Sequence, residues 1–170
     1  MAKPLVLGEW VARMIDGAPA EVAAVDTTSI NLFKLLTSAL RMRPDRKVIL
    51  SNRENFPIDL TKAQGLGDWL DRRHTLCLVA EDEFLVTINE DAAVVMLKHT
   101  NFKTGRVRDM AGITQAARKA EALTLWSLAN SAGVFQVELN KAGAEYVVGC
   151  SYKYLNAAPQ GAFLFVAERH

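Results

Sequence analysis

The feature that most constrains the fold is a series of short, almost continuous apolar runs. Each run is four to six residues long and rich in Val, Leu and Ile, and the runs lie at residues 47–51, 75–80, 94–97, 123–128, 146–151 and 162–166. A strand with one solvated face alternates apolar and polar residues, whereas an unbroken apolar run fits a strand that is buried on both faces. The runs therefore predict a sheet that is covered by helices on both sides.

Longer segments with helical patterning separate most of these runs. We expect helices at residues 6–16, from about 30 to just before Pro44, from the turn at 55–59 to about Arg72, at 109–120 and at 129–142. Helices between strands imply right-handed crossovers and parallel pairing. The last two runs have no helix between them, so that final pair can be antiparallel. We predict one open α/β domain over residues 1–170, with a mostly parallel sheet and helices on both faces.

Composition excludes some classes of function. The net charge is +1, from 20 basic and 19 acidic residues, which gives no electrostatic reason to expect a nucleic acid or an anionic membrane as partner. No apolar run approaches the roughly 20 residues of a membrane span, and the N-terminus lacks the apolar core of a signal peptide. Cys77 and Cys150 lie in apolar runs without metal-ligand spacing, so we expect buried thiols, no metal site and a cytoplasmic location.

A ligand site is expected where the parallel strands end. In open α/β sheets, ligands bind beyond the carboxyl ends of the strands. The segments that this rule brings to one edge of the sheet are residues 26–29, 52–59, 98–105, 127–131 and 151–156. They contain hydroxyl, aromatic, carboxylate and amine side chains.

Each candidate in these segments has a structural and a functional interpretation. Lys153 follows the run at 146–151; it could simply cap the sheet and reach water, or serve as a Schiff-base nucleophile because burial frees its amine. The hydroxyls at residues 27–29 could cap a helix, or could form a phosphate site with the N–H groups of its first turn. Phe56 could belong to the core or stack on a planar ligand ring. The residue pattern alone favours the structural interpretation of each.

Four segments together resemble kynureninase. They are residues 28–34 (Thr-Ser-Ile-Asn-Leu-Phe-Lys), 55–59 (Asn-Phe-Pro-Ile-Asp), 101–105 (Asn-Phe-Lys-Thr-Gly) and 150–156 (Cys-Ser-Tyr-Lys-Tyr-Leu-Asn). Kynureninases are pyridoxal 5'-phosphate (PLP) enzymes of fold type I, the aspartate aminotransferase fold. They hydrolyse L-kynurenine to anthranilate and L-alanine in tryptophan catabolism. The order and spacing of the segments agree along essentially the whole chain.

The resemblance implies a role for each matching residue. Lys153 matches the lysine that holds the cofactor covalently, and it is the expected catalytic residue. Thr28, Ser29 and Tyr152 match groups that bind the cofactor phosphate. Phe56 matches the aromatic residue that stacks on the pyridine ring, and Asp59 matches a nearby cofactor contact. The resemblance also implies a homodimer, or self-association, with the cofactor site near the interface.

The chain departs from the family pattern in the same site. The family has Trp-Asp-Leu-Ala-His where residues 126–130 read Trp-Ser-Leu-Ala-Asn, so Ser127 and Asn130 replace an aspartate and a histidine at cofactor-binding positions. Lys98 stands where the family has a small hydroxyl residue. Kynureninases are also longer and carry a C-terminal small domain with the arginine that binds the substrate carboxylate. We therefore expect impaired hydrolysis, and the alternative is a non-catalytic domain that retains the fold.

Overall fold

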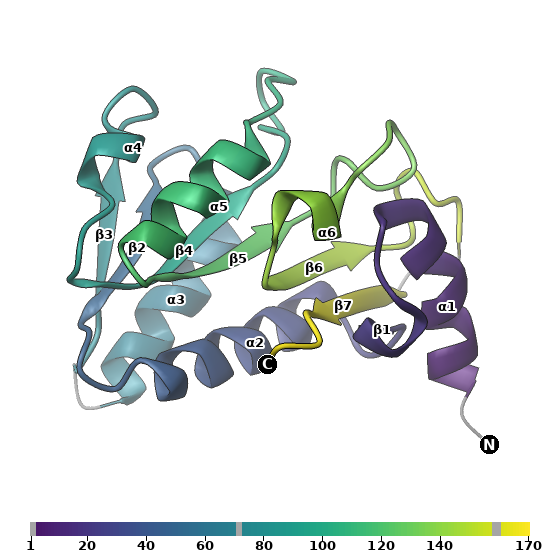
Figure 1. The fold of residues 1–170 in the computed structure, drawn as a ribbon, viewed down its shortest axis with the longest axis horizontal. Coiled ribbons are helices and arrows are strands. Elements are labelled where there is room, and N and C mark those ends of the chain that lie inside the picture. Colours follow the sequence, from purple (N-terminus) through teal and green to yellow (C-terminus); the bar gives the residue numbers. More distant parts are fainter. Residues whose placement is uncertain (1–2, 71–72, 158–160) are drawn as a thin grey trace.

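Seven strands form one sheet in the part of the chain that the computed structural model describes, residues 3–70, 73–157 and 161–170. The strand order is β1-β7-β6-β5-β4-β2-β3 (Figure 1). The strands are β1 (Val22–Ala23), β2 (Val48–Asn52), β3 (Thr75–Val79), β4 (Ala92–Lys98), β5 (Leu123–Ser127), β6 (Tyr146–Cys150) and β7 (Ala162–Val166). The strands β3, β2, β4, β5 and β6 are neighbours in that order and pair in parallel, whereas β7 pairs antiparallel with both β6 and β1. The predicted mostly parallel sheet and its antiparallel final pair are confirmed.

Helices cover both faces of this sheet. They are α1 (Lys3–Ile15), the 3-10 turn η1 (Pro19–Glu21), α2 (Thr28–Met42), α3 (Pro57–Trp69), α4 (Phe84–Thr87), α5 (Met110–Lys119) and α6 (Leu139–Ala142). Most begin and end within a few residues of their predicted bounds. The short helix α4 and the turn η1 were not predicted, because each is too short to show a helical repeat.

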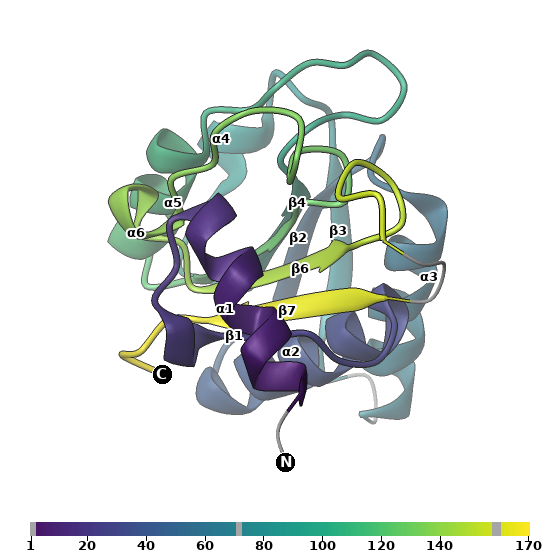
Figure 2. The same ribbon diagram turned by 90° about the vertical axis from the view of Figure 1, so that its right-hand side faces the viewer.

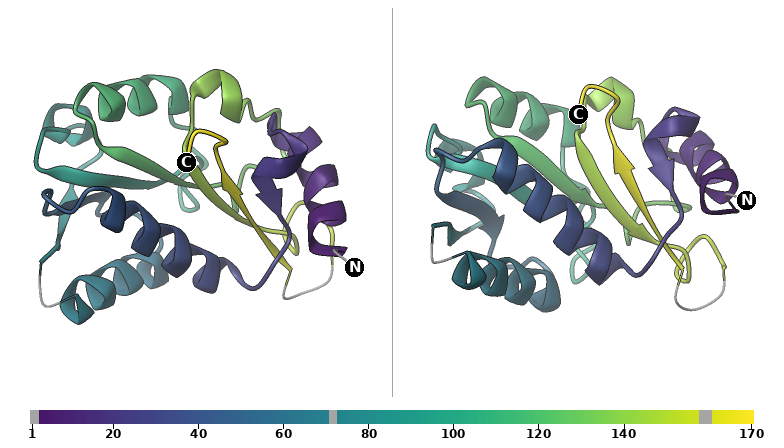
Figure 3. Two further views of the ribbon diagram at one scale, coloured as in Figure 1. Left: turned by 60° about the horizontal axis from the view of Figure 1, so that its bottom comes forward. Right: turned by 90° about the horizontal axis from the view of Figure 1, so that it is seen from below.

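The face under α2 and α3 has its own apolar core. Leu32, Leu36 and Leu40 recur along one side of α2 and pack against Val94 and Leu125 of the central strands. Figure 3 shows α2 lying along the sheet with α3 beside it. Thr27 caps α2, because its side chain accepts a hydrogen bond from the N–H of Ile30 at 3.3 Å. The helix is therefore fixed at its N-terminus, close to the carboxyl edge of the sheet.

The opposite face is covered by α5, α6 and α1. Trp126 and Val147 contribute to this core from the central strands, and Ala12, Ile15 and Phe165 contribute to it at the α1 end. Figure 2 looks onto that end, where α1 lies across β7. Both faces of the central strands are thus buried, which explains why their sequences lack polar alternation.

The predicted helix at residues 129–142 is largely wrong. Only Leu139–Ala142 is helical, and the preceding residues form turns. Gly133 has a φ of +85° and passes so close to the Lys153 loop that a Cβ on it would lie 2.6 Å from the carbonyl oxygen of Tyr154. A continuous helix would exclude both features, so the packing of two loops overrides the helical pattern here.

Candidate functional site

Three strands place polar side chains on one face of the sheet at its carboxyl edge. Side chains two residues apart in a strand share a face. Lys98, Ser127 and Cys150 each lie two residues after an apolar residue of the core under α2 and α3. Those apolar residues are Met96, Leu125 and Val148, respectively. Lys98 and Ser127 are also direct neighbours in the register of β4 and β5. The predicted convergence of polar groups at this edge is therefore present.

Lys153 lies in the loop that leaves β6 at this edge. Its side chain is half-buried, and Nζ donates a hydrogen bond to Oδ1 of Asn130 at 3.4 Å. The loop is closed by a bond from the N–H of Ala157 to the carbonyl of Ser151 at 3.0 Å. Tyr152, next to Lys153, is half exposed, at 51%. The structure thus joins Lys153 directly to one predicted site residue, Asn130, and leaves Tyr152 at the surface.

An aromatic pair borders the same site. Phe56 precedes α3, and its ring meets that of Phe102 edge to face with centroids 5.4 Å apart. A hydrogen bond from Nδ2 of Asn101 to Glu54 at 2.8 Å holds the two loops together. The ammonium of Lys98 lies 4.7 Å from the centre of the Phe56 ring and 5.6 Å from that of Phe102. Phe56 is therefore half-buried beside an amine rather than part of the apolar core.

Asp59 and Lys98 are two buried ionisable groups in this site. Asp59 lies in the first turn of α3 and is 7% exposed, and Lys98 is 4% exposed. Burial raises the pKa of Asp59, although Lys98, Lys62 and Lys153 offset part of this effect. Burial lowers the pKa of Lys98, with Asp59 acting in the opposite direction. The two groups influence each other, but no ion pair within 4.0 Å joins them in the described chain.

Ser127 presents an unsatisfied hydroxyl to the site. Its side chain is 5% exposed, and Oγ has no hydrogen-bond partner among the described residues. A buried hydroxyl without a partner is unfavourable by about 1–3 kcal/mol and is uncommon in native proteins. The orphaned oxygen, beside Lys98 on the next strand, is therefore the kind of group that a bound ligand would satisfy.

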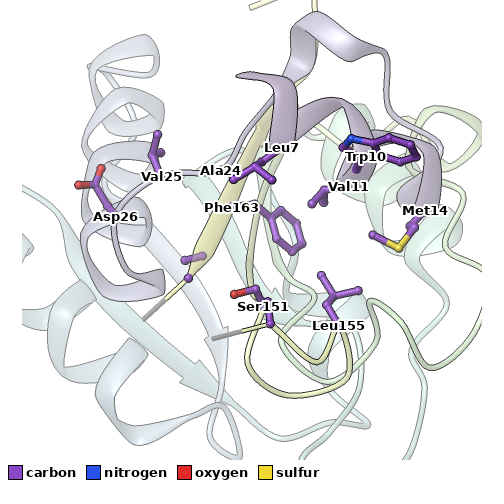
Figure 4. A pocket seen from close by; sticks show the side chains of 13 residues that line it. Leu7, Trp10, Val11, Met14, Ala24, Val25, Asp26, Ser151, Leu155 and Phe163 are labelled. Atoms are coloured by element: carbon purple, nitrogen blue, oxygen red, sulfur yellow. The ribbon is translucent and has the colours of Figure 1, made fainter. Parts of the chain in front are cut away.

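Thr28 and Ser29 lie apart from this cluster in the first turn of α2. Both are half-buried, and no hydrogen bond links either side chain to Lys153 within the described residues. The segment just before them does approach the Lys153 loop: Val25 and Asp26 line one groove together with Ser151 and Leu155 (Figure 4). The structure thus places the N-terminus of α2 across a groove from the loop that carries Lys153.

Sequence reasoning missed an ion pair that fixes the end of β4. Arg108 binds Glu81 through Nε at 2.8 Å, and its Nη1 donates to the carbonyl oxygen of Lys98 at 2.8 Å. His99 packs near Trp126 and Phe135, and burial, followed by the charge of Arg108, lowers its pKa to about 4. No local pattern signals the Arg108–Glu81 pair, because its members come from separate loops 27 residues apart.

Cys77 is half-buried rather than buried as predicted, Cys150 is buried, and both thiols are free. Residues 3–70, 73–157 and 161–170 contain no cluster of three or more His, Cys, Asp or Glu side chains that could hold a metal ion. No helix in the same ranges is both long enough and apolar enough to cross a membrane.

Known structures share this fold. A NifS-like protein superposes with a TM-score of 0.83 over 96% of this chain and 47% of its own, at 13% sequence identity. A C-DES mutant with glycine covalently linked to the PLP cofactor superposes with a TM-score of 0.77 over 97% of this chain and 46% of its own, at 16% identity. These superpositions show that the chain shares the fold of both proteins, a mostly parallel sheet with helices on both faces, as predicted.

Sequence relatives are much more similar. Kynureninase from Pseudomonas fluorescens is 47% identical over 169 residues, which are 96% of this chain and 41% of the relative. Kynureninase from Burkholderia pseudomallei (strain 1106a) is 48% identical over 175 residues, which cover 99% of this chain and 42% of the relative. The chain thus spans about 41–42% of the length of these kynureninases. The sequence model of the family named aminotransferase class-V matches residues 10–168, and the chain belongs to that family.

Proposed function

We propose that this chain is the cofactor-binding core of a kynureninase-type PLP enzyme, with Lys153 as the residue that holds PLP covalently. The resemblance to kynureninase implies PLP as the cofactor, and the C-DES structure that shares this fold carries glycine linked to PLP. The observation that carries the proposal is the position of Lys153, whose amine lies at the carboxyl edge of the parallel sheet against Asn130. The reaction proposed for the whole protein is hydrolysis of L-kynurenine to anthranilate and L-alanine.

The residues present fit the chemical groups of PLP. Lys153 offers an amine for its aldehyde, and the orphaned Oγ of Ser127 offers a hydrogen bond to the pyridine nitrogen. The first turn of α2, with Thr28 and Ser29, supports a phosphate role because free N–H groups and the helix dipole favour anions there. Phe56 offers a ring face, although the Lys98 ammonium rests against it and must move before a planar ring can stack.

Each residue then has a distinct task. PLP supplies an electron sink that stabilises negative charge on a bound amino acid. Lys153 holds the cofactor and carries protons at Nζ, while Asn130 orients that nitrogen. Tyr152 is proposed to join Thr28 and Ser29 at the phosphate, and Asp59 is proposed to lie beside the ring with Phe56. These roles are supported by the shared edge of the sheet and by the similarity to kynureninases.

Catalysis is proposed to be impaired. A hydroxyl at residue 127 cannot provide the negative charge that keeps a pyridine nitrogen protonated, and a protonated ring is the better electron sink. When Lys98 is protonated, its positive charge disfavours protonation of the ring further. The second candidate function is a non-catalytic domain, and the observation that favours it is the same juxtaposition of Ser127 with Lys98.

Titration with PLP and an assay for anthranilate distinguish the two candidates. We expect a visible absorption band that appears with PLP and is much weaker in Lys153→Ala, together with little anthranilate from kynurenine. Robust anthranilate release by the unmodified chain would show that hydrolysis is not impaired. A chain that gives no band at any PLP concentration would instead be a non-catalytic domain.

We also propose that the chain self-associates as a homodimer through α1. Leu7, Trp10 and Met14 are 57%, 61% and 44% exposed on one side of the helix, and they border an apolar groove of about 530 Å³ that reaches Phe163 (Figure 4). A contiguous apolar surface of this kind is typical of an interface. A cytoplasmic location is proposed as well, with the two free thiols in support.

Sedimentation velocity tests this assembly. The parent chain is expected to show a concentration-dependent dimer that Trp10→Glu abolishes. Trp69 is 69% exposed on α3, so Trp69→Glu is a matched control that should leave the dimer intact. A monomer over a wide concentration range, or equal loss in both variants, would contradict the proposed interface.

A further inference from the structure

Lys98 is a buried amine in an aromatic setting. It ends β4, its side chain is 4% exposed, and its Nζ lies near the rings of both Phe56 and Phe102. In the described residues its ammonium forms no ion pair within 4.0 Å. Burial disfavours the charged form of this amine, although the two ring faces and the charge of Asp59 offset part of that effect, and the neutral form is the nucleophile.

A carboxyl group lies in the same environment. Asp59 is buried, and its charge raises the pKa of Lys98. Cys150 acts in the same direction, whereas the charge of Lys153 lowers that pKa. The pKa of Asp59 is raised and that of Lys98 is lowered, in both cases mainly because of burial. Burial therefore shifts both groups toward their neutral forms.

We propose that Lys98 is a second carbonyl-reactive amine in this site, and that it forms an imine with planar aromatic aldehydes. The lone pair of Nζ forms a bond to the carbonyl carbon, and the carbonyl π electrons move to the oxygen. That oxygen gains protons and leaves as water, while the nitrogen loses two protons overall. Solvent water can carry these protons from the nitrogen to the oxygen, so the step requires no oxidant or other reactant.

The lining of the site determines the class of aldehyde. The rings of Phe56 and Phe102 flank Nζ and favour a flat aromatic body. The unsatisfied Oγ of Ser127, next to Lys98 in the register, favours a ring that carries a polar atom. The Lys98 reaction needs no phosphate group, unlike the PLP binding proposed above. The inference depends on the proposed function only in that both use the same edge of the sheet.

Labelling with pyridoxal, which lacks the phosphate, tests this inference. The chain is incubated near neutral pH with pyridoxal and cyanoborohydride, which reduces any imine to a stable amine, and the modified lysines are mapped by mass spectrometry. Lys103 is a matched internal control, because its Nζ also lies near Phe102, at 5.7 Å, but the residue is exposed. We expect Lys98 to be labelled several-fold faster than Lys103, because burial disfavours the charged form of its amine.

Variants separate this result from that of Lys153. In Lys153→Arg, pyridoxal should still label Lys98, whereas Phe56→Leu should slow that labelling while Lys103 is unchanged. Labelling of Lys98 no faster than that of Lys103 would overturn the inference, as would a rate that is unchanged by Phe56→Leu. The proposed function has its own readout, PLP on Lys153, so either proposal can fail while the other stands.

Discussion

Replacing Ser127 by aspartate is expected to tighten PLP binding by about tenfold or more. The side chain at residue 127 is buried, lies at the end of β5 and has no partner for its oxygen among the described residues. A carboxylate there could hold a proton on the pyridine nitrogen through a charged hydrogen bond, which contributes about 1.5–3 kcal/mol. Each 1.4 kcal/mol corresponds to a factor of about ten in affinity.

The measurement is a PLP titration of the parent, Ser127→Asp and Ser127→Asn, followed by absorbance. Asparagine has nearly the same shape as aspartate but no charge, so it should give little of the gain. Adding Asn130→His should shift the spectrum further toward the protonated cofactor, while kynurenine hydrolysis remains weak. Equal affinities for the aspartate and asparagine variants would show that charge at residue 127 is not what limits binding.

Replacing Gly149 by valine is expected to destabilise the fold by about 3 kcal/mol, at the upper end of the range for overpacked cores. Gly149 faces Phe163 across the β6–β7 pair, and a Cβ on it would lie 2.2 Å from Cζ of that ring. Phe163 is 1% exposed and therefore has little room to move. Because Gly149 directly precedes the segment that leads to Lys153, this packing also sets the direction of the loop.

Urea unfolding measures this effect. Gly65→Ala is a matched control in the middle of α3, because a Cβ there would meet nothing within 4 Å. That substitution should stabilise the chain by about 0.5–1 kcal/mol, the usual difference between glycine and alanine in a helix. A Gly149→Val variant as stable as the parent would show that β7 packs differently from the arrangement described above.

The sheet was predictable because its signal is local. Unbroken runs such as residues 94–97 indicate strands buried on both faces, and the intervening helices fix parallel order. The loop at residues 129–138 was not predictable in the same way. Its pattern is compatible with a helix, and only the close approach of Gly133 to the Lys153 loop excludes one. Contacts between segments far apart in the chain leave no periodic signal.

The site was predictable in outline but not in detail. The ends of parallel strands converge by topology, so the sequence alone predicts Lys153, Asn130 and Ser127 at one edge. The position of Lys98 against Phe56 depends on side-chain conformation and on the register of β4 with β5, which the sequence does not state. For this reason the sequence showed Lys98 as an unusual residue without showing that it lies on the ring face proposed for the cofactor.

The most direct test of the central claim is borohydride reduction of the PLP-treated chain, followed by peptide mapping. If Lys153 holds the cofactor, the pyridoxyl group is found mainly on the peptide that contains Lys153, and Lys153→Ala loses that label while retaining a native unfolding transition. If the label from PLP lies mainly on Lys98 or Lys103, or is unchanged in Lys153→Ala, the assignment of Lys153 is wrong.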